Sequence, residues 1–245
     1  MALRDITLSI VSHAQNTLTN QLLGDIARHC AARVRLVLVE NIADPVPLAT
    51  GGVPFPVEVI ANRRAKGFGA NHNAAFARCH TPFFCVMNPD LRLHADPFAG
   101  LLRAMHDEHV ALAAPLVRRP GGGVEDSARR FPTAGSLLAK LFRKGPPLAE
   151  YAVDRGPLEV DWVAGMCMLF RAADYRRLGG FDEAYFLYYE DVDICWRLKK
   201  RGRKVLYQPA AEVVHDARRA SRRDPRLARH HLRGMARFLL RRALG

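Results

Sequence analysis

Short apolar runs alternate with amphipathic segments through the first half of the chain. Unbroken apolar runs predict buried β-strands, and apolar residues spaced three to four positions apart predict helices. Strands that alternate with helices are typical of a mostly parallel sheet with helices on both faces, so this half predicts an α/β fold. The predicted strands span 6–11, 34–39, 57–61, 83–87 and 110–117, and the predicted helices span 17–32, 71–80 and 96–109.

The pattern changes between residues 118 and 161, where Gly, Pro and charged residues predominate. We expect a long loop region here, with one short apolar piece at 136–142. Regular structure is predicted again beyond it. The expected elements are a strand over 160–170, a helix over 172–178, a turn at Gly179-Gly180, a helix over 189–201, strands over 204–207 and 212–214, and a final helix over 225–244 with Asp224 as its cap and Pro225 at its first position.

Charge is distributed unevenly along the 245 residues, whose formal net charge is +13. Residues 1–196 carry 21 basic and 21 acidic side chains, whereas residues 197–245 carry 16 basic and 3 acidic ones. A neutral body with a basic tail argues against a protein that wraps nucleic acid, and it favours a tail that meets an anionic partner. Hydrophobic residues make up 49% of the chain, which is ordinary for a globular protein with a real core.

The cysteines and the apolar runs indicate the compartment. None of the five cysteines forms a CxxC pair, so we expect buried, reduced thiols, which fits a cytoplasmic protein. No signal peptide is visible at the start of the sequence. No apolar run approaches the roughly 18–20 residues that a membrane-spanning helix needs. A protein of this kind that works at a membrane would lie on its surface.

The predicted final helix is basic and amphipathic. Ala228, Leu232, Met235 and Leu239 repeat at helical spacing, and arginines fall mostly on the other faces. This pattern is typical of a segment that lies in an anionic membrane surface, together with the arginines between 218 and 223. The alternative is that the apolar stripe packs on the protein's own domain, as most amphipathic helices do. Both interpretations stay open on the sequence.

Carboxylates gather at two places that bear on chemistry. The first is Asn88-Pro89-Asp90, directly after the predicted strand 83–87. Ligands of open α/β sheets bind outside the carboxyl ends of the strands, so Asp90 is a candidate to hold a divalent cation and a diphosphate. The same three residue types also form ordinary strand-end turns.

The second place is the start of the predicted helix 189–201, where Glu190, Asp191 and Asp193 follow two tyrosines. The helix dipole favours acids in a first turn, which is a purely structural explanation. Desolvation by the aromatic neighbours and like-charge crowding would instead raise a carboxylate pKa, which suits a general base. The residues alone leave both explanations open.

Two further features are weaker. Gly67-Phe68-Gly69 is half of a dinucleotide fingerprint, but a loop that brings backbone close to a ligand at a helix start explains it as well. His215 follows an apolar run and precedes an aspartate. It becomes a candidate metal ligand only if Asp90 holds a metal, because imidazole often accompanies carboxylate.

Eight segments, in order along nearly the whole chain, resemble glycosyltransferase family 2, the inverting nucleotide-sugar transferases of GT-A fold. The nearest branch is the bacterial rhamnosyltransferase-like group. The resemblance implies a doubly covered, mostly parallel sheet with a catalytic domain over 1–215 and a basic helical tail over 216–245. The segments are TLSIVSH, VEN, NRRAKGFGANHNAAF, MNPDLRL, RRFPT, DWVAGMCMLFR, GGFDEAYFLYYEDVDICWRLKKRG and AEVVHDARRAS.

The resemblance also implies roles for the matching residues. Residues 1–117 would form a nucleotide-binding half, 118–159 a loop region, and 160–215 an acceptor and catalytic half. Asp90, with His215, would hold Mg²⁺ or Mn²⁺, although Asn88 replaces the family's usual first aspartate and leaves one carboxylate. The nucleotide-sugar side would comprise Ser12, His13, Glu40 (where the family usually has Asp), Asn41, Asn62, Gly67, Phe68, Asn73 and Asn88, and the acceptor side Trp162, Gly165 and Asp182.

The implied reaction is a single displacement at the anomeric carbon, with Asp191 as the base and Glu190 as the second candidate. The implied donor is dTDP-L-rhamnose, or else a UDP-sugar, and the implied acceptor is a glycan or lipid-linked glycan, with no nucleic-acid partner. A nucleotidyltransferase of related fold is one alternative, but SIVSHAQN is not the Gly-rich basic loop that it needs after the first strand. A non-enzymatic basic module for membrane or nucleic acid is another, and it leaves the clustered acids unexplained.

Overall fold

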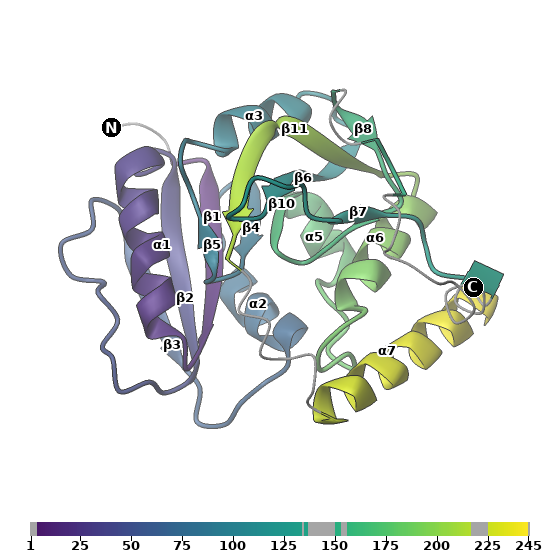
Figure 1. Ribbon diagram of the computed structural model, residues 1–245, viewed down its shortest axis with the longest axis horizontal. Helices are drawn as coiled ribbons and strands as arrows, with labels where there is room; N and C mark the ends of the chain where they lie inside the picture. Colours follow the sequence, from purple (N-terminus) through teal and green to yellow (C-terminus); the bar gives the residue numbers. More distant parts are fainter. Residues whose placement is uncertain (1–3, 134, 137–149, 153–155, 217–224, 245) are drawn as a thin grey trace.

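A nine-stranded sheet forms the centre of the molecule (Figure 1). The computed structural model describes residues 4–133, 135–136, 150–152, 156–216 and 225–244. The strands follow the order β3-β2-β1-β4-β10-β6-β11-β5, and β8 pairs with the outer side of β11. Their bounds are β1 Ile6–His13, β2 Val34–Ile42, β3 Val57–Ala61, β4 Phe83–Met87, β5 Leu91–Arg92, β6 Val110–Arg118, β8 Leu158–Glu159, β10 Cys167–Arg171 and β11 Lys204–His215.

Parallel pairing dominates the sheet, as predicted. The strands β3, β2, β1 and β4 are parallel neighbours, and β6 is parallel to β11, while β10 runs antiparallel between β4 and β6. The carboxyl ends of the parallel strands and the amino end of β10 therefore lie along one edge, which we call the carboxyl edge. Each segment that follows a parallel strand starts there, so this edge is where a ligand site forms.

Helices cover both faces because successive strand residues point to opposite sides. Leu36 and Leu38 of β2 face a core layer built with α1 and α3, whereas Val37 and Val39 face a second layer built with α2, α5 and α6. The bounds are α1 Asn16–His29, α2 Phe68–Phe76, α3 Phe98–Ala104, α5 Ala172–Leu178 and α6 Glu190–Lys200. The five cysteines are buried free thiols, as predicted.

The predicted single strand over 160–170 is wrong. The structure has two strands there: β9 (Trp162–Val163) pairs with β7 (Ala128–Arg129) in a small second sheet, and β10 joins the central sheet. Between them the backbone leaves strand geometry, because the N–H of Ala164 donates to Ser127 and the N–H of Gly165 donates to a carboxylate. Tertiary hydrogen bonds have here overridden a continuous apolar run.

The opposite error occurs at β11, which the sequence divides into two short strands. The structure has one strand, Lys204–His215, with an irregular register against β6 between Gln208 and Glu212. Pro209 lies within that irregular stretch, and proline cannot donate a ladder hydrogen bond. The strand bulges there rather than ending. Asp224 and residues 137–142 of the predicted apolar piece lie outside the described residues.

The final helix, α7 (Pro225–Leu244), has the predicted extent and packs on its own domain beside α6 (Figure 1). It docks through Gly234 and the fully buried Phe238, which lies among Tyr185, Tyr189 and other aromatic residues. Only half of the aliphatic stripe takes part: Met235 packs against this cluster and Leu239 is half-buried, whereas Ala228 and Leu232 stay exposed. An aromatic pocket selects the one phenylalanine of the helix, which the spacing of aliphatic residues does not reveal. No helix in the described part of the chain is both long and apolar enough to cross a membrane.

Candidate active site

The ends of β1 and β2 carry a chain of buried polar groups. The hydroxyl of Ser12 donates to Asn16 Oδ1 at 2.5 Å, and Asn16 Nδ2 donates to Glu40 Oε1 at 3.3 Å. Ser12 and Asn16 are fully buried, whereas Glu40 is partly exposed. Serine and glutamate thus meet at the carboxyl edge as predicted, through an asparagine that the sequence analysis did not single out.

A second network joins the ends of β2 and β3 to α2. Asn41 Oδ1 accepts from Asn62 Nδ2 (2.9 Å) and from the N–H of Lys66 (2.8 Å), and Asn41 Nδ2 donates to the Lys66 carbonyl (3.0 Å). Asn62 Nδ2 also donates to Asn71 Oδ1 at 2.6 Å. The exposed His13 accepts from Asn41 at 2.9 Å. Five of the predicted nucleotide-side positions therefore lie in two adjoining networks at one edge.

Gly67 brings the start of α2 against the segment that precedes α6. A Cβ at Gly67 would lie 2.6 Å from the carbonyl oxygen of Phe186, so no larger residue fits. The N–H of Phe68 donates to that same carbonyl at 2.9 Å. The nucleotide-side loop and the acidic segment are thereby held together.

Asn73 does not join the nucleotide-side group. Its Oδ1 accepts from the Tyr175 hydroxyl and the N–H of Phe181, and its Nδ2 donates to the Phe181 carbonyl and to Glu183. All four hydrogen-bonding positions of the side chain are used in packing α2 against the end of α5. The structure therefore gives Asn73 a structural place, and Asn71, two residues earlier, occupies the network instead.

His72 is a buried partner that the sequence analysis missed. Its Nδ1 lies 2.7 Å from the Ser9 hydroxyl in the middle of β1, and its ring meets Phe68 edge-on at 4.4 Å. Burial lowers the pKa of His72 to about 3, so the ring is neutral at physiological pH. It packs the helix on the sheet and takes no part in charge chemistry.

Asp90 and His215 meet at the ends of β4 and β11. His215 Nε2 lies 3.2 Å from Asp90 Oδ2, and His215 Nδ1 lies 2.8 Å from Glu125 Oε2. Burial works to lower the pKa of His215, but the two carboxylates outweigh it and raise that pKa to about 9. The other oxygen of Asp90, Oδ1, is buried without a partner among the described residues. The predicted pair is confirmed as neighbours, and Glu125, from the long loop region, is an addition that no spacing in the sequence indicates.

Glu190 and Asp191 form a desolvated pair at the start of α6. Burial and the charge of Asp191 raise the pKa of Glu190 well above its usual range, and Glu190 Oε2 has no partner within the described residues. Burial also raises the pKa of Asp191, while N–H bonds from Val192 (2.9 Å) and Gly165 (3.1 Å) oppose the rise. Asp191 is the more accessible of the two. The pair has the environment of a general base.

The backbone before this pair adopts an uncommon conformation. Tyr188 and Tyr189 both have a φ of 71°, which costs a non-glycine residue of order 1–3 kcal/mol and persists only where the surroundings enforce it. Gly234 of α7 lies against them: a Cβ there would be 2.7 Å from the Tyr188 carbonyl. The docked helix therefore supports the turn that aims Glu190 and Asp191.

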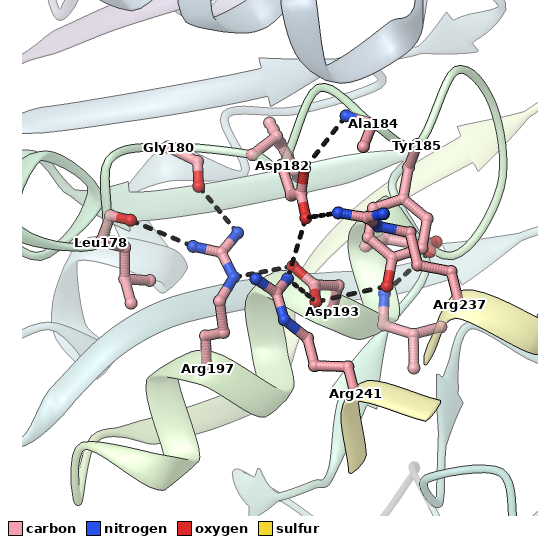
Figure 2. Close-up of polar contacts among 12 residues, drawn as sticks. Leu178, Gly180, Asp182, Ala184, Tyr185, Asp193, Arg197, Arg237 and Arg241 are labelled. Atoms are coloured by element: carbon pink, nitrogen blue, oxygen red, sulfur yellow. Dashed lines mark hydrogen bonds and ion pairs between the residues drawn. The ribbon is translucent and has the colours of Figure 1, made fainter. Parts of the chain in front are cut away.

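Asp193 and Asp182 belong to an ion cluster with α7 (Figure 2). Asp193 is fully buried and binds Arg197 (2.7 Å) and Arg241 (2.6 Å). Asp182 binds Arg237 (2.9 Å) and Arg241 (3.0 Å). Burial works to raise the pKa of Asp182, but these hydrogen bonds outweigh it and lower that pKa. Of the three acids at the start of α6, Glu190 and Asp191 face the site, whereas Asp193 anchors α7. Asp182 also binds α7 and does not form an open acceptor surface.

The segment between β9 and β10 connects the two acidic places. The N–H of Asn88 donates to the Met166 carbonyl at 2.9 Å, and the neighbouring Gly165 donates to Asp191. A Cβ at Gly165 would lie 3.2 Å from the Phe68 ring. Asn88, Gly165 and Asp191 are therefore brought together, as the predicted site requires.

Trp162 lies at the far side of this segment. Its Nε1 donates to the Arg130 carbonyl at 2.9 Å, and the Arg129 guanidinium lies over its ring at 5.5 Å. The charge of Arg129 also works to lower the pKa of Asp191. Trp162 thus belongs to the surroundings of the acidic pair, and Arg129 is a basic neighbour that the sequence analysis missed.

Comparison with known proteins places these features in context. The family model described as "Glycosyltransferase like family 2" matches residues 5–236. An N-acetylglucosaminyl-diphospho-decaprenol L-rhamnosyltransferase of Mycobacterium tuberculosis is 37% identical over 157 residues, which cover 60% of this chain and 51% of that protein. Rhamnosyltransferase WbbL of Escherichia coli is 30% identical over 193 residues, covering 73% and 72%. The chain thus spans about half the length of the mycobacterial relative.

Solved structures agree on the fold. The mannosyltransferase PcManGT of Pyrobaculum calidifontis, in complex with GDP-Man and Mn²⁺, superposes with a TM-score of 0.65 at 15% identity over 89% of this chain and 58% of that one. GalNAc-T7 with UDP, GalNAc and Mn²⁺ also gives 0.65, at 16% identity over 87% and 44%. These likenesses confirm the expected fold and, at such identities, the fold alone.

Proposed function

The chain belongs to Glycosyltransferase like family 2 and has the GT-A fold, and from this premise we propose that it transfers a sugar, with inversion, from a nucleoside diphosphate sugar to a hydroxyl of a glycan or lipid-linked glycan. Residues 1–117 would bind the nucleotide and 160–215 would supply the acceptor side, with 118–159 between them. The observation that carries the proposal is the Glu190–Asp191 pair, desolvated at the edge of the sheet and joined through Gly165 to the Asn88–Asp90 segment.

Asp191 is our choice for the general base. Two N–H donors orient its carboxylate, and it is more accessible than Glu190. It would take the proton from the acceptor hydroxyl as the hydroxyl oxygen attacks the anomeric carbon and the bond to the diphosphate breaks. Glu190 is the alternative base, because two adjacent carboxyls titrate as a pair. In its buried place beside Asp191, Glu190 has the more strongly raised pKa and would stay protonated next to an ionised Asp191.

Asp90 and His215 would hold the divalent metal, Mg²⁺ or Mn²⁺. The unpartnered Oδ1 of Asp90 fits a cation, and His215 would join it as a ligand by giving up the proton that its raised pKa otherwise retains. No group of three or more His, Cys, Asp or Glu side chains in the described residues is arranged to hold a metal. The protein would therefore supply part of the coordination and the donor's diphosphate the rest. When bound, the metal would neutralise charge on the leaving diphosphate.

Titration calorimetry tests the metal. Binding of a nucleoside diphosphate should be strong with Mg²⁺ or Mn²⁺ and weak in EDTA, and Asp90→Ala should bind weakly in both conditions. Equal affinities with and without EDTA for the unmutated protein would remove the metal from the proposal.

The relatives suggest the donor and the acceptor. Two of them are rhamnosyltransferases by name, and one acts on a sugar carried by diphospho-decaprenol. We take dTDP-L-rhamnose as the first donor to test and UDP-sugars as the second. A glycan on a lipid diphosphate is the corresponding acceptor.

A panel of nucleotide sugars tests the reaction. Hydrolysis or transfer with one donor, followed by NMR of the new anomeric centre, should show consumption of the donor and an inverted product. A retained configuration would contradict the single displacement. No turnover of any donor, together with nucleotidyl transfer, would favour the nucleotidyltransferase alternative.

We also propose that the protein binds the inner surface of an anionic membrane through α7. The outward face of the helix keeps Leu232, Leu240 and Leu244 exposed by 59%, 64% and 87% beside exposed arginines, which is the pattern of an interfacial helix. Salt-sensitive flotation with vesicles containing acidic lipid, and little with neutral vesicles, is expected. The Leu232→Gln/Leu240→Gln variant leaves the docking face intact and should lose this binding. Unchanged flotation of that variant would contradict a membrane role for the face.

A further inference from the structure

A basic groove separates α7 from the segment just before the catalytic pair. It encloses about 300 Å³ and has no acidic residue among its lining residues. Three basic side chains of α7 form one wall, and backbone and aromatic groups of 184–187 form the other. The lining residues are Ala184, Tyr185, Phe186, Leu187, His230, Arg233, Gly234 and Arg237.

The two arginines of the groove differ in their hydrogen bonding. Arg237 is anchored: it donates to Asp182 at 2.9 Å and lies over the Tyr185 ring at 5.3 Å. Arg233 has neither a hydrogen bond nor an ion pair within the part of the chain that the structure describes, and it is exposed. His230 is held flat against Phe186, with ring centroids 4.9 Å apart. An anchored cation beside a free one, on a fixed aromatic wall, fits an anion with several oxygens.

The groove lies between the start of α2 and the turn that precedes the catalytic pair. Phe186, in its wall, accepts the N–H of Phe68 at the start of α2, and Gly234, in its floor, touches the Tyr188 carbonyl two residues before Glu190. Its anchored arginine binds Asp182, which holds α7 on the domain. The donor's diphosphate is already assigned to Asp90, on a different segment of the chain, so we assign an anion held on α7 to the acceptor.

The helix also places apolar surface beside the groove. Leu240 lines a neighbouring cavity of about 410 Å³ together with Arg237 and Arg241, and Leu240 is 64% exposed. Around α7, the basic flank thus lies between the docked face and the exposed leucines. A molecule with a charged head and a hydrocarbon tail matches this order, because the head would meet the arginines while the tail meets the apolar face.

We propose that this groove binds the diphosphate of a lipid-linked acceptor, with Arg233 as the residue that recognises it. The inference rests on the proposed function, which it deepens by assigning the acceptor's diphosphate to α7 and the donor's to Asp90. Recognition of the lipid carrier would be separate from recognition of the acceptor sugar. A glycan on a diphosphate-linked chain would then be preferred over the same glycan on a neutral chain.

The test compares Arg233→Gln with Arg229→Gln. Arg229 is an exposed arginine one turn earlier on the same helix, outside the groove, so both variants lose one charge from α7. Calorimetry with farnesyl diphosphate should show about tenfold weaker binding for Arg233→Gln and no change for Arg229→Gln, because a hydrogen bond to a charged group is lost only in the first. Equal affinities of the two variants would overturn the proposal.

A kinetic arm uses two acceptors, one glycan on a prenyl diphosphate and the same glycan on a neutral alkyl chain. Arg233→Gln should raise KM about tenfold for the first only, with kcat and the KM for the donor unchanged. A rise for both acceptors would overturn the proposal. Absence of transfer with any donor would contradict the proposed function, while the calorimetry would still decide whether the groove binds a diphosphate.

Vesicles separate the acceptor's diphosphate from lipid headgroups. Vesicles of phosphatidylcholine with phosphatidylglycerol should bind the two variants equally, since each has lost one charge. If Arg233→Gln alone loses vesicle binding and keeps its affinity for farnesyl diphosphate, the groove recognises headgroups and the proposal fails.

Discussion

Asn41 and Glu190 are equally buried, each with 4% of its surface exposed, yet their surroundings are opposite. Both sides of the Asn41 amide are hydrogen-bonded, to Asn62, to His13 and to the backbone of Lys66. Glu190 has one oxygen without a partner among the described residues and a second carboxylate beside it. One edge of a single sheet thus carries a satisfied polar network and an unsatisfied acidic pair.

The two environments suit two different functions, binding and acid–base chemistry. A fully hydrogen-bonded amide network is rigid, because opening any one bond would leave a polar group without a partner. Such a network can hold a fixed binding surface. A desolvated carboxyl pair gains by taking up a proton, so it is poised for acid–base chemistry. Four predictions test this contrast, from the largest expected effect to the smallest.

Asp191→Asn should fold and lose activity. General-base catalysis contributes about 10²–10⁴-fold, so the transfer rate should fall by at least that much. The Kd for the donor should barely change, because the networks at Asn41 and Ser12 are untouched. Single-turnover transfer and calorimetry measure the two quantities.

Glu190→Gln is the companion variant. If Asp191→Asn keeps most of its rate while Glu190→Gln is inactive, the base is Glu190. If both variants are active, the base mechanism is wrong.

Asn41→Ala should weaken folding more than catalysis. It removes the Asn41 bonds to the Lys66 backbone and to the Asn62 amide, while the Lys66 carbonyl keeps its bond from Asn71, and the loss of these part-buried bonds costs about 1–3 kcal/mol of unfolding free energy. Donor affinity should fall while kcat is nearly unchanged. Urea unfolding and KM against kcat provide the measurements.

Asn20→Ala is the matched control, because Asn20 of α1 also bonds backbone groups, but those of the exposed residues Pro47 and Ala49. Equal losses of stability in the two variants would mean that the buried network has no special rigidity.

Gly234→Ala should reduce kcat by roughly tenfold, because the new methyl group would press on the Tyr188 carbonyl and displace the turn before Glu190. Better helix propensity, worth about 1 kcal/mol, offsets part of the strain on stability. Gly24→Ala in α1 is the control, since nothing lies within 4 Å of a Cβ there. Unchanged kcat in Gly234→Ala would show that α7 does not position the acidic pair.

The pH dependence should show the raised pKa of the pair. Burial raises the pKa of Asp191 above its ordinary value, and the base must be ionised to accept a proton, so kcat should fall as the pH drops through that raised pKa. Glu190, whose pKa is raised well above its ordinary value by burial and by the charge of Asp191, is protonated while Asp191 titrates, so Glu190→Gln should leave this fall in place. A pH profile of kcat for both proteins decides, and an acid limb that moves to lower pH would mean that an ionised Glu190 raises the pKa of Asp191.

Much of the fold could be predicted from local pattern. Burial makes apolar runs into strands and amphipathic runs into helices, so β3, β4, α5 and α7 lie within a residue of the predicted bounds. The exceptions are stretches where distant groups decide the backbone. Ala164 and Gly165 turn toward Ser127 and Asp191, and β11 continues through an irregular register because β6 supports both sides of it.

The site residues also fall into two groups, those predicted from the sequence and those that only the structure placed. Residue types predicted Asp90 at the end of a strand and the pair Glu190–Asp191 at the start of a helix, because chemistry and chain position are both local properties, and the family resemblance added Asn41. Only the tertiary structure assigned Asn71 rather than Asn73 to the network, brought Glu125 to His215, and separated Asp193 from its two neighbours to hold α7. Hydrogen bonds and ion pairs between segments far apart along the chain depend on which face each residue presents after packing. The sequence by itself therefore predicted the edge of the sheet at which the candidate side chains gather, and packing decided which of them face one another.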